Sequence, residues 1–325
     1  MREMGKGNIR ILALLIFGLG VFPHFIHSDY YISIMIFMGI NAIIVMGLSL
    51  LMGYAGQISL GHAAFYGIGA YSSGVLTVKF GFSIFTAFLF GIFLSTVMAM
   101  AIAIPTLKLK GHYLAVATFG FGQIIYIIFN QLLEITGGPY GLSGIPNLVV
   151  FGYVFEGGTK YFYLVWGITI LLLIFALNVI YSRVGRALRA IQGSEVAAQV
   201  MGVNVSRFKV QIFVLSAIYA SISGSLYAHF VTYISPPAFS LLVSLLLLMM
   251  VVIGGRGSIW GALLGTAILT ILPEYLRPFK DFDTLVYGVI LMAILLFMPE
   301  GLLNGLNVLM KLIKKKIISR KMVRG

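Results

Sequence analysis

Apolar runs of about 20 residues recur along the whole chain, and no other feature limits the possible folds as strongly. Hydrophobic residues make up 60% of the 325 positions and charged residues only 10%, and the mean hydropathy is +1.04. A helix of about 20 apolar residues spans the hydrocarbon core of a bilayer. Helices also satisfy their own backbone hydrogen bonds in lipid. The sequence therefore predicts an all-α polytopic membrane protein.

The apolar runs predict about ten transmembrane helices in a single transmembrane domain, residues 1–325. The expected spans are 9–26, 31–52, 58–78, 82–105, 112–133, 161–181, 209–231, 238–254, 258–276 and 284–304. The first span follows three basic residues, as a signal peptide would. No small residues in a cleavage-site pattern follow it, so we expect a retained helix.

Positive charge is distributed unevenly between the predicted loops. With the N-terminus inside, one side of the membrane collects 18 of the 22 Lys and Arg residues. Cytoplasmic loops carry such an excess. Both termini, the turn at 106–112 and the segment 182–208 are therefore predicted to be cytoplasmic. The loop 134–160 is predicted to be external, and the basic tail 305–325 to lie on the anionic inner leaflet. The net charge of +13 thus indicates membrane orientation rather than nucleic-acid binding.

The segment 182–209 is the only long polar interruption with dense positive charge. Its basic residues are Arg183, Arg186, Arg189, Arg207 and Lys209. Ser194 is predicted to cap a short helix, with the Glu195 carboxylate in its first turn and Gly202 just after its last. Charge and periodicity support two interpretations equally. One is a knob that fits a groove of a partner protein, and the other is an amphipathic helix on the membrane surface.

A second informative stretch, residues 53–71, combines small and polar side chains. Small residues at helical spacing let another helix backbone approach closely. We therefore expect Gly61, Ala63 and Gly67 at a helix contact. Polar side chains within spans are often functional, which makes a set of neutral residues candidates for a polar path across the membrane. They are Gln57, Ser59, His62, Thr118, Gln123 and Asn130. A purely structural helix contact is the equal alternative for the polar residues of 53–71.

The loop 134–160 is rich in Gly and Pro, which forbid a spanning helix and indicate a folded surface segment. This segment either docks a soluble external partner or caps the helix bundle. Capping is the simpler expectation.

Several chemistries lack the residues that they need. The chain has no Cys, so it forms no disulfide and no thiolate metal site. It has no Gly-x4-Gly-Lys-Ser/Thr loop for ATP, no metal-ligand spacing and no Ser–His–Asp set. The predicted spans carry almost no acidic residue away from their ends, whereas ion-coupled transporters usually need such groups. We expect a non-enzymatic conduit that binds no metal or cofactor itself and has no motor of its own.

Six motifs in order resemble the branched-chain amino-acid permeases of prokaryotic ABC importers, and most closely their LivM-type subunit. They are Gly-Gln-Ile-Ser-Leu-Gly-His-Ala-Ala-Phe at 56–65, Thr-Gly-Gly-Pro-Tyr-Gly-Leu at 136–142, Arg-Ala-Leu-Arg-Ala-Ile at 186–191, Tyr-Ile-Ser-Pro-Pro-Ala-Phe at 233–239, Val-Ile-Gly-Gly-Arg-Gly-Ser at 252–258 and Phe-Met-Pro-Glu-Gly-Leu at 297–302. The resemblance covers about residues 30–303.

This resemblance implies a permease subunit that translocates Leu, Ile and Val across the prokaryotic cytoplasmic membrane. The implied partners are a LivH-type permease subunit, two ATPase subunits that hold ATP and Mg, and an external or periplasmic substrate-binding protein. The same importer architecture for urea or short amides is the alternative. An ion-coupled secondary transporter and a non-transporting membrane scaffold fit the residues less well.

The resemblance also implies a role for residues 194–203, as the coupling helix that docks on an ATPase subunit. The expected coupling residues are Glu195, Val196, Ala197, Ala198, Val200, Met201 and Gly202. Val196 stands where an Ala directly follows Glu in the family pattern.

Overall fold

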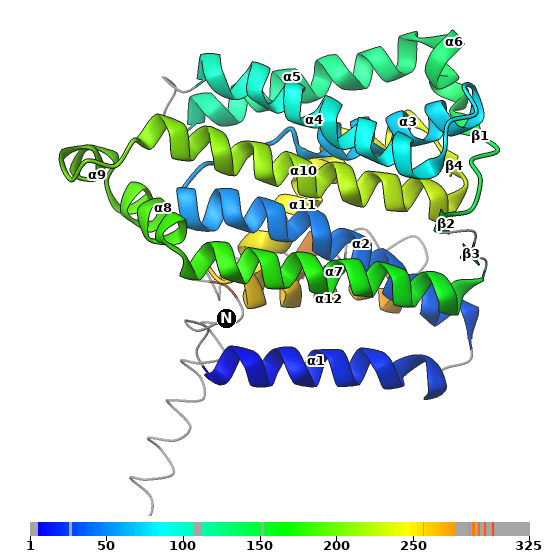
Figure 1. Cartoon of the computed structure of the whole chain (residues 1–325), viewed down its shortest axis with the longest axis horizontal. Helices are drawn as coiled ribbons and strands as arrows, with labels where there is room; N and C mark the ends of the chain where they lie inside the picture. The colour runs from blue at the N-terminus through cyan, green and yellow to red at the C-terminus, as the bar shows by residue number, and fades with distance from the viewer. Residues whose placement is uncertain are drawn as a thin grey trace, which may run out of the picture.

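The described chain is a bundle of long helices that run roughly along one axis (Figure 1). The computed structural model describes residues 6–25, 28–106, 112–150, 153–155, 157–255 and 257–276, with a few isolated positions beyond 285. Eight helices in the described residues are long and apolar enough to cross a membrane. The prediction of an all-α multi-pass membrane protein is confirmed. Apart from these isolated positions, the predicted span 284–304 lies outside the described residues, as does the whole tail 305–325.

The long helices follow the predicted spans closely. They are α1 (Lys6–Phe25), α2 (Asp29–Ser49), α3 (His62–Val78), α4 (Ile84–Thr106), α5 (His112–Gln131), α7 (Gly158–Tyr181), α10 (Val205–Val231), α11 (Leu241–Gly254) and α12 (Ile259–Leu276). A π-helical turn, Leu50–Tyr54, extends α2. The helix α3 begins at His62, four residues after the predicted start of the third span, and both end at Val78. Gly56 before it takes a φ of +66°, a left-handed conformation that favours glycine and interrupts the helix.

The shorter elements gather at the two ends of the bundle (Figure 1). The helices α8 (Arg183–Gly193) and α9 (Glu195–Val200) lie at one end, together with the starts of α1 and α5. The helix α6 (Leu133–Thr136) and the strands β1 (Leu142–Ser143), β2 (Val149–Val150), β3 (Tyr153–Val154) and β4 (Tyr233–Ile234) lie at the other. This arrangement agrees with the predicted alternation of loops. Which end faces the cytoplasm stays a prediction.

The segment 134–160 is folded onto the end of α10. Its strand β1 pairs antiparallel with β4, and β2 pairs with β3. The amide of Ile145 donates to the Thr232 carbonyl at 3.2 Å, and the Pro146 carbonyl lies 2.7 Å from Nδ1 of His229. The segment therefore covers this end of the bundle, as the capping interpretation expects.

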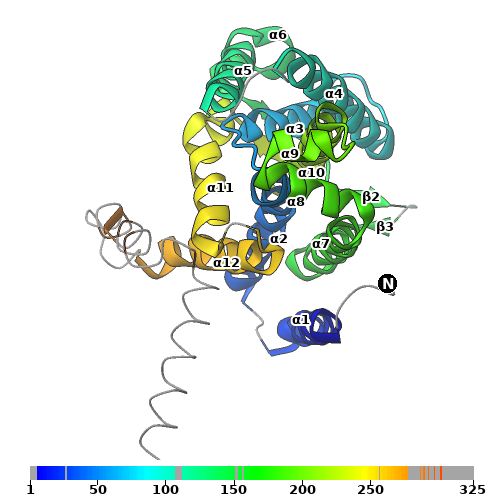
Figure 2. The ribbon, with the colours of Figure 1, turned by 90° about the vertical axis from the view of Figure 1, so that its left-hand side faces the viewer.

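At the centre of the bundle α10 packs against α3, α4 and α2, as the end-on view also shows (Figure 2). The backbones of α3 and α10 touch directly. A Cβ on Gly224 would overlap the Tyr66 carbonyl oxygen, and one on Gly69 would overlap that of Ser221. Ser225 Oγ donates to the Gly69 carbonyl at 3.0 Å. Glycine permits this approach because it has no side chain.

The small residues expected at a helix contact do lie in close contacts. Gly61 lies against the carbonyl of Thr118 on α5, and Gly67 lies against the ring of Phe129. Ala63 is buried. The tightest contact in this region therefore uses Gly69 and α10 rather than these three positions.

Candidate functional site

A buried network of neutral polar groups joins the start of α3 to α10. Nδ1 of His62 lies 2.9 Å from Ser59 Oγ, and Nε2 bonds to Ser216 Oγ on α10. His62, Ser59 and Ser216 are all almost fully buried. Both partners of the imidazole are hydroxyl groups, which serve as donor or acceptor as the tautomer requires. The network thus fixes the ring between two helices without any charged partner.

Side chains from α5 and α11 hold the backbone at the start of α3. Thr118 Oγ1 accepts from the amide of Leu60 at 3.0 Å, and Ser244 Oγ on α11 accepts from that of Ala63 at 3.0 Å. The first amides of a helix have no partner within the helix. Here other helices supply these partners, so the start of α3 is a junction of four helices: α3, α5, α10 and α11.

The six predicted path residues do not line one cavity. Ser59, His62 and Thr118 meet in the buried junction just described. Gln123 lies on a small cavity of about 10 Å³ together with Ser240 and Ser244. The other two lie elsewhere. Asn130 Nδ2 donates to the Tyr126 carbonyl of its own helix, and Gln57 lines a separate cavity beside Lys209. A path role for all six stays a prediction.

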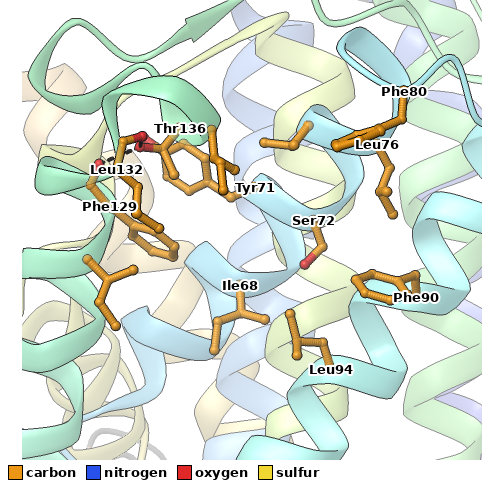
Figure 3. Close-up of a pocket in the computed structure, with 13 residues that line it drawn as sticks. Ile68, Tyr71, Ser72, Leu76, Phe80, Phe90, Leu94, Phe129, Leu132 and Thr136 are labelled. Atoms are coloured by element: carbon orange, nitrogen blue, oxygen red, sulfur yellow. Dashed lines mark hydrogen bonds between the residues drawn. The ribbon is translucent and has the colours of Figure 1, made fainter.

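An apolar pocket of about 330 Å³ lies between α3, α4 and α5 (Figure 3). Tyr71 and Phe129 contribute aromatic rings to its wall, 4.3 Å apart between centroids, and Phe90 and Leu132 are exposed. The hydroxyl of Tyr71 is buried and has no hydrogen-bond partner among the described residues. The pocket contains none of the six predicted path residues.

The short helix α9 has the ends that the sequence predicts. Ser194 Oγ accepts from the amide of Ala197 at 3.3 Å, and Glu195 lies in the first turn. The amide of Gly202 donates to the Gln199 carbonyl at 2.9 Å, with a φ of +82°. A left-handed glycine after the last turn is a common helix stop. Both the cap and the stop are confirmed.

The inner face of α9 is anchored on the chain itself. Ala198 is only 2% exposed and packs with Ile191 of α8 and Val205 of α10. Nζ of Lys209 lies 2.5 Å from Oε1 of Glu195. Ala198 is one of the coupling residues predicted to contact a partner protein. The structure places it inside, where it fixes the helix and is not available to another protein.

The outer face of α9 is apolar and exposed. Val200 and Met201 are each 83% exposed and Val196 is 65% exposed. The helix projects beyond the end of the bundle (Figure 1), and the end-on view places it over α10 and α3 rather than at the rim (Figure 2). We call these three residues the α9 tip. Exposed apolar clusters mark contact sites.

The predicted site residues do not include Ser216, Ser244 or Lys209. Serines are common in packed transmembrane helices, so no local signal set the first two apart from their neighbours. Lys209 was counted among loop charges, yet it is only 4% exposed and belongs to the first turns of α10. Its position directly before a long apolar run was the available signal.

The fold and these site features define the class of protein. The chain is a multi-pass, all-α membrane protein, with a polar junction of neutral groups inside the bundle and an anchored apolar tip at one end. It belongs to the family described as the permease component of the branched-chain amino acid transport system, whose model matches residues 30–299.

Individual relatives agree with this family. The chain is 31% identical to the high-affinity branched-chain amino acid transport system permease protein LivM of Escherichia coli K12, over 92% of this chain and 75% of that protein. It is 23% identical to a probable LivM of Methanocaldococcus jannaschii, over 89% and 98%. It is also 27% identical to LivH of Escherichia coli K12, over 81% and 91%. No solved structure matches the chain.

Proposed function

We propose that this chain is a membrane-spanning subunit of a binding-protein-dependent ABC importer of the prokaryotic cytoplasmic membrane. It moves branched-chain amino acids inward, and ATP hydrolysis on partner subunits drives the movement. Membership of the permease family supports the transport role. The α9 tip carries the coupling role, because it is an exposed apolar surface that projects from the end that the charge distribution assigns to the cytoplasm.

The construction of α9 supports docking on a partner rather than binding to lipid. A membrane-surface helix lies at the bilayer plane with its apolar face buried in lipid. The α9 tip instead projects over the centre of the bundle (Figure 2). Its inner face is fixed by Ala198 and Glu195, so the outer side chains are held in position before a partner arrives. Such pre-organisation lowers the entropy cost of binding.

The similarity to both LivM and LivH proteins supports a heterodimer with a LivH-type subunit. This chain aligns with LivH of Escherichia coli K12 over 91% of that protein, so the two kinds of subunit share most of their length. The proposed complex also contains two ATPase subunits, which bind ATP and Mg, and an external substrate-binding protein. This chain itself binds no cofactor and has no ATPase activity of its own.

The proposed cargo, Leu, Ile and Val, rests on the names of the relatives. Urea or a short amide in the same architecture is the alternative. A competition assay distinguishes branched-chain amino acids from urea or a short amide as the cargo. Excess Ile and Val should block uptake of labelled Leu by the complete importer, and excess urea or acetamide should not. Competition by urea as strong as that by Val would assign the cargo to the alternative class.

The energy source is tested with the complete complex in proteoliposomes and no ion gradient. Uptake should require ATP on the side of the ATPase subunits and binding protein on the other side. The candidate path groups are neutral, so they cannot couple cargo movement to a proton or sodium gradient. If the purified chain alone accumulated cargo under such a gradient, the importer proposal would be wrong.

Orientation is tested with single cysteines, because the chain has no native Cys. Ser194→Cys at α9 should resist a membrane-impermeant maleimide applied to intact cells and react after permeabilisation. Val149→Cys, exposed at the opposite end of the bundle, should react in intact cells. The reverse pattern would place both chain termini outside.

A further inference from the structure

Lys209 is buried at the junction between α9 and the membrane bundle. Its Nζ pairs with Oε1 of Glu195 at 2.5 Å, and its side chain is 5% exposed. An ammonium group carries three donors, and a buried charge is costly unless pairing and hydrogen bonds compensate it. Oε1 of Glu195 accepts from one of these donors, so the remaining donors of Lys209 need further acceptors.

Such an acceptor lies on the same cavity. Gln57 is buried, and its Oε1 has no hydrogen-bond partner among the described residues. Lys209 and Gln57 both line a cavity of about 10 Å³, together with Thr106 and Phe213. That volume is about the size of one water molecule, and a buried water needs two to four polar partners. Three of the lining residues, Lys209, Gln57 and Thr106, carry groups that can serve as such partners: an ammonium, an amide oxygen and a hydroxyl.

We infer that Lys209 is a positioning residue for coupling, joined to Gln57 through one water molecule in this cavity. Nζ of Lys209 donates to the water oxygen, and the water donates to Gln57 Oε1 and to Thr106 Oγ1. A continuous polar chain then runs from Glu195 on α9 to the segment that precedes α3. The role of this chain in coupling rests on the proposed importer function.

The segment that Gln57 belongs to is well placed to receive a movement of α9. At one end of the segment, Gly56 packs against Gln192 of α8. At the other end, the amide of Leu60 is hydrogen-bonded to Thr118 of α5. His62, the first residue of α3, is hydrogen-bonded to Ser216 of α10. A displacement of α8 and α9 by the ATPase therefore reaches the four-helix junction through Gly56 and through Lys209. Only the second of these contacts is polar and can be removed without altering the backbone.

The role is tested with Lys209→Met in the complete importer in proteoliposomes. Methionine is unbranched and only one atom shorter than lysine, so it keeps most of the side chain's packing and removes its donors. The cargo moved per ATP hydrolysed should fall about tenfold, the size of effect expected when a charge-assisted hydrogen bond is lost, while ATP hydrolysis persists. The matched control is Arg207→Met, an exposed cation two residues earlier, which should keep the wild-type ratio. A wild-type ratio in Lys209→Met overturns the inference.

If Lys209→Met fails to accumulate in the membrane, Gln57 gives the same test from the other end. Gln57→Met removes the acceptor and should lower the ratio of cargo to ATP. Gln57→Glu keeps an acceptor oxygen at the same place and should retain more of that ratio. Equal, wild-type ratios in both variants contradict the inference.

The water-bridged contact has a test that needs no ATPase. Thermal unfolding of the purified chain is measured for Gln57→Met, Lys209→Met and the double variant. The double variant should lose clearly less than the sum of the two single losses, because either change breaks the same bridge. Additive losses would overturn the bridge. This result is independent of the importer assay, so a failure of the proposed function and a failure of this inference remain distinguishable.

Discussion

The helix α10 has two regions that differ sharply in how they are held. Its middle, from Ser216 to His229, lies against α3 with backbone touching backbone, and its hydroxyl groups are buried. Its beginning carries α9 through the Lys209–Glu195 ion pair and a small cluster around Ala198. The middle has no room for an added atom at its contact with α3, whereas α9 exposes its apolar outer face. One helix thus combines a fixed part of the bundle with an element suited to move against a partner.

Residues in these two regions should therefore affect different properties of the protein. Substitutions at the α3–α10 contact should act first on stability, and their effect on transport follows from unfolding. Substitutions on the outer face of α9 should leave stability unchanged and act on association with another protein. Substitutions at Gly224, His62, Ala198 and Val200 should reduce the stability of the bundle in that order, from the largest loss to the smallest.

The largest loss is expected from Gly224→Ala. The added Cβ would overlap the Tyr66 carbonyl oxygen, and a clash with backbone cannot be relieved by a rotamer change. We expect a loss of about 1–3 kcal/mol or more in thermal unfolding of the purified chain. Gly120→Ala on α5 is the matched control, since no atom lies within 4 Å of its added Cβ. It should be neutral or slightly stabilising. Equal melting temperatures for the two variants would show that the α3–α10 contact can accept an added methyl group.

His62→Leu should have the next largest effect. It leaves the buried hydroxyls of Ser59 and Ser216 without their imidazole partner, and each unsatisfied buried group costs about 1–3 kcal/mol. His24→Leu, at an exposed position in α1, is the control. A second variant, Ser216→Ala, should cost less in the His62→Leu background than in the wild-type chain. Additivity between the two changes would show that the His62–Ser216 bond does not stabilise the bundle.

Ala198→Arg should release α9 and leave the membrane bundle folded. The Arg side chain does not fit between Ile191 and Val205, and overpacking costs about 1–3 kcal/mol, with more for an unpaired buried charge. Hydrogen exchange of the amides in 194–203 should become faster, and uptake by the complex should be lost. Ala197→Arg, at an exposed neighbouring position, should keep slow exchange. Protection of 194–203 in Ala198→Arg would mean that Ala198 is not the anchor.

Val200→Glu should have the smallest effect on stability. An exposed substitution changes the free energy of unfolding by about 0.5 kcal/mol or less. It should nevertheless weaken the association with the ATPase subunit by about tenfold or more, because a charge replaces apolar contact area at an interface core. The control Val149→Glu lies in β2, at the opposite end of the bundle (Figure 1), and should bind the ATPase normally. Equal affinities for the two variants would remove the α9 tip from the interface.

The sequence predicted those features that depend on neighbours along the chain. Spans follow from runs of apolar residues, and the ends of α9 follow from Ser194 and Gly202, which act within one turn. The start of α3 was misplaced by four residues, because the left-handed conformation of Gly56 is not visible in hydropathy.

Features that depend on tertiary packing were not predictable in this way. One of the two partners of His62 is Ser216, 154 positions away, and no local pattern connects these two residues. The direction in which Ala198 points is set by contacts with α8 and α10, so a six-residue helix gave no basis for separating its inner from its outer face. The polar path residues were predicted from residue type alone, and the structure distributes them among four places.

The most direct test of the account is a site-specific crosslink from the α9 tip. In the Met201→Cys variant the introduced cysteine is the only thiol, because the chain has no native Cys. In the assembled importer, a short maleimide–amine crosslinker should join this position to the ATPase subunit, and the yield should change when ATP is added. Val149→Cys should form no such product. A crosslink to the ATPase from Val149→Cys and none from Met201→Cys would contradict the claim that α9 couples the bundle to the motor.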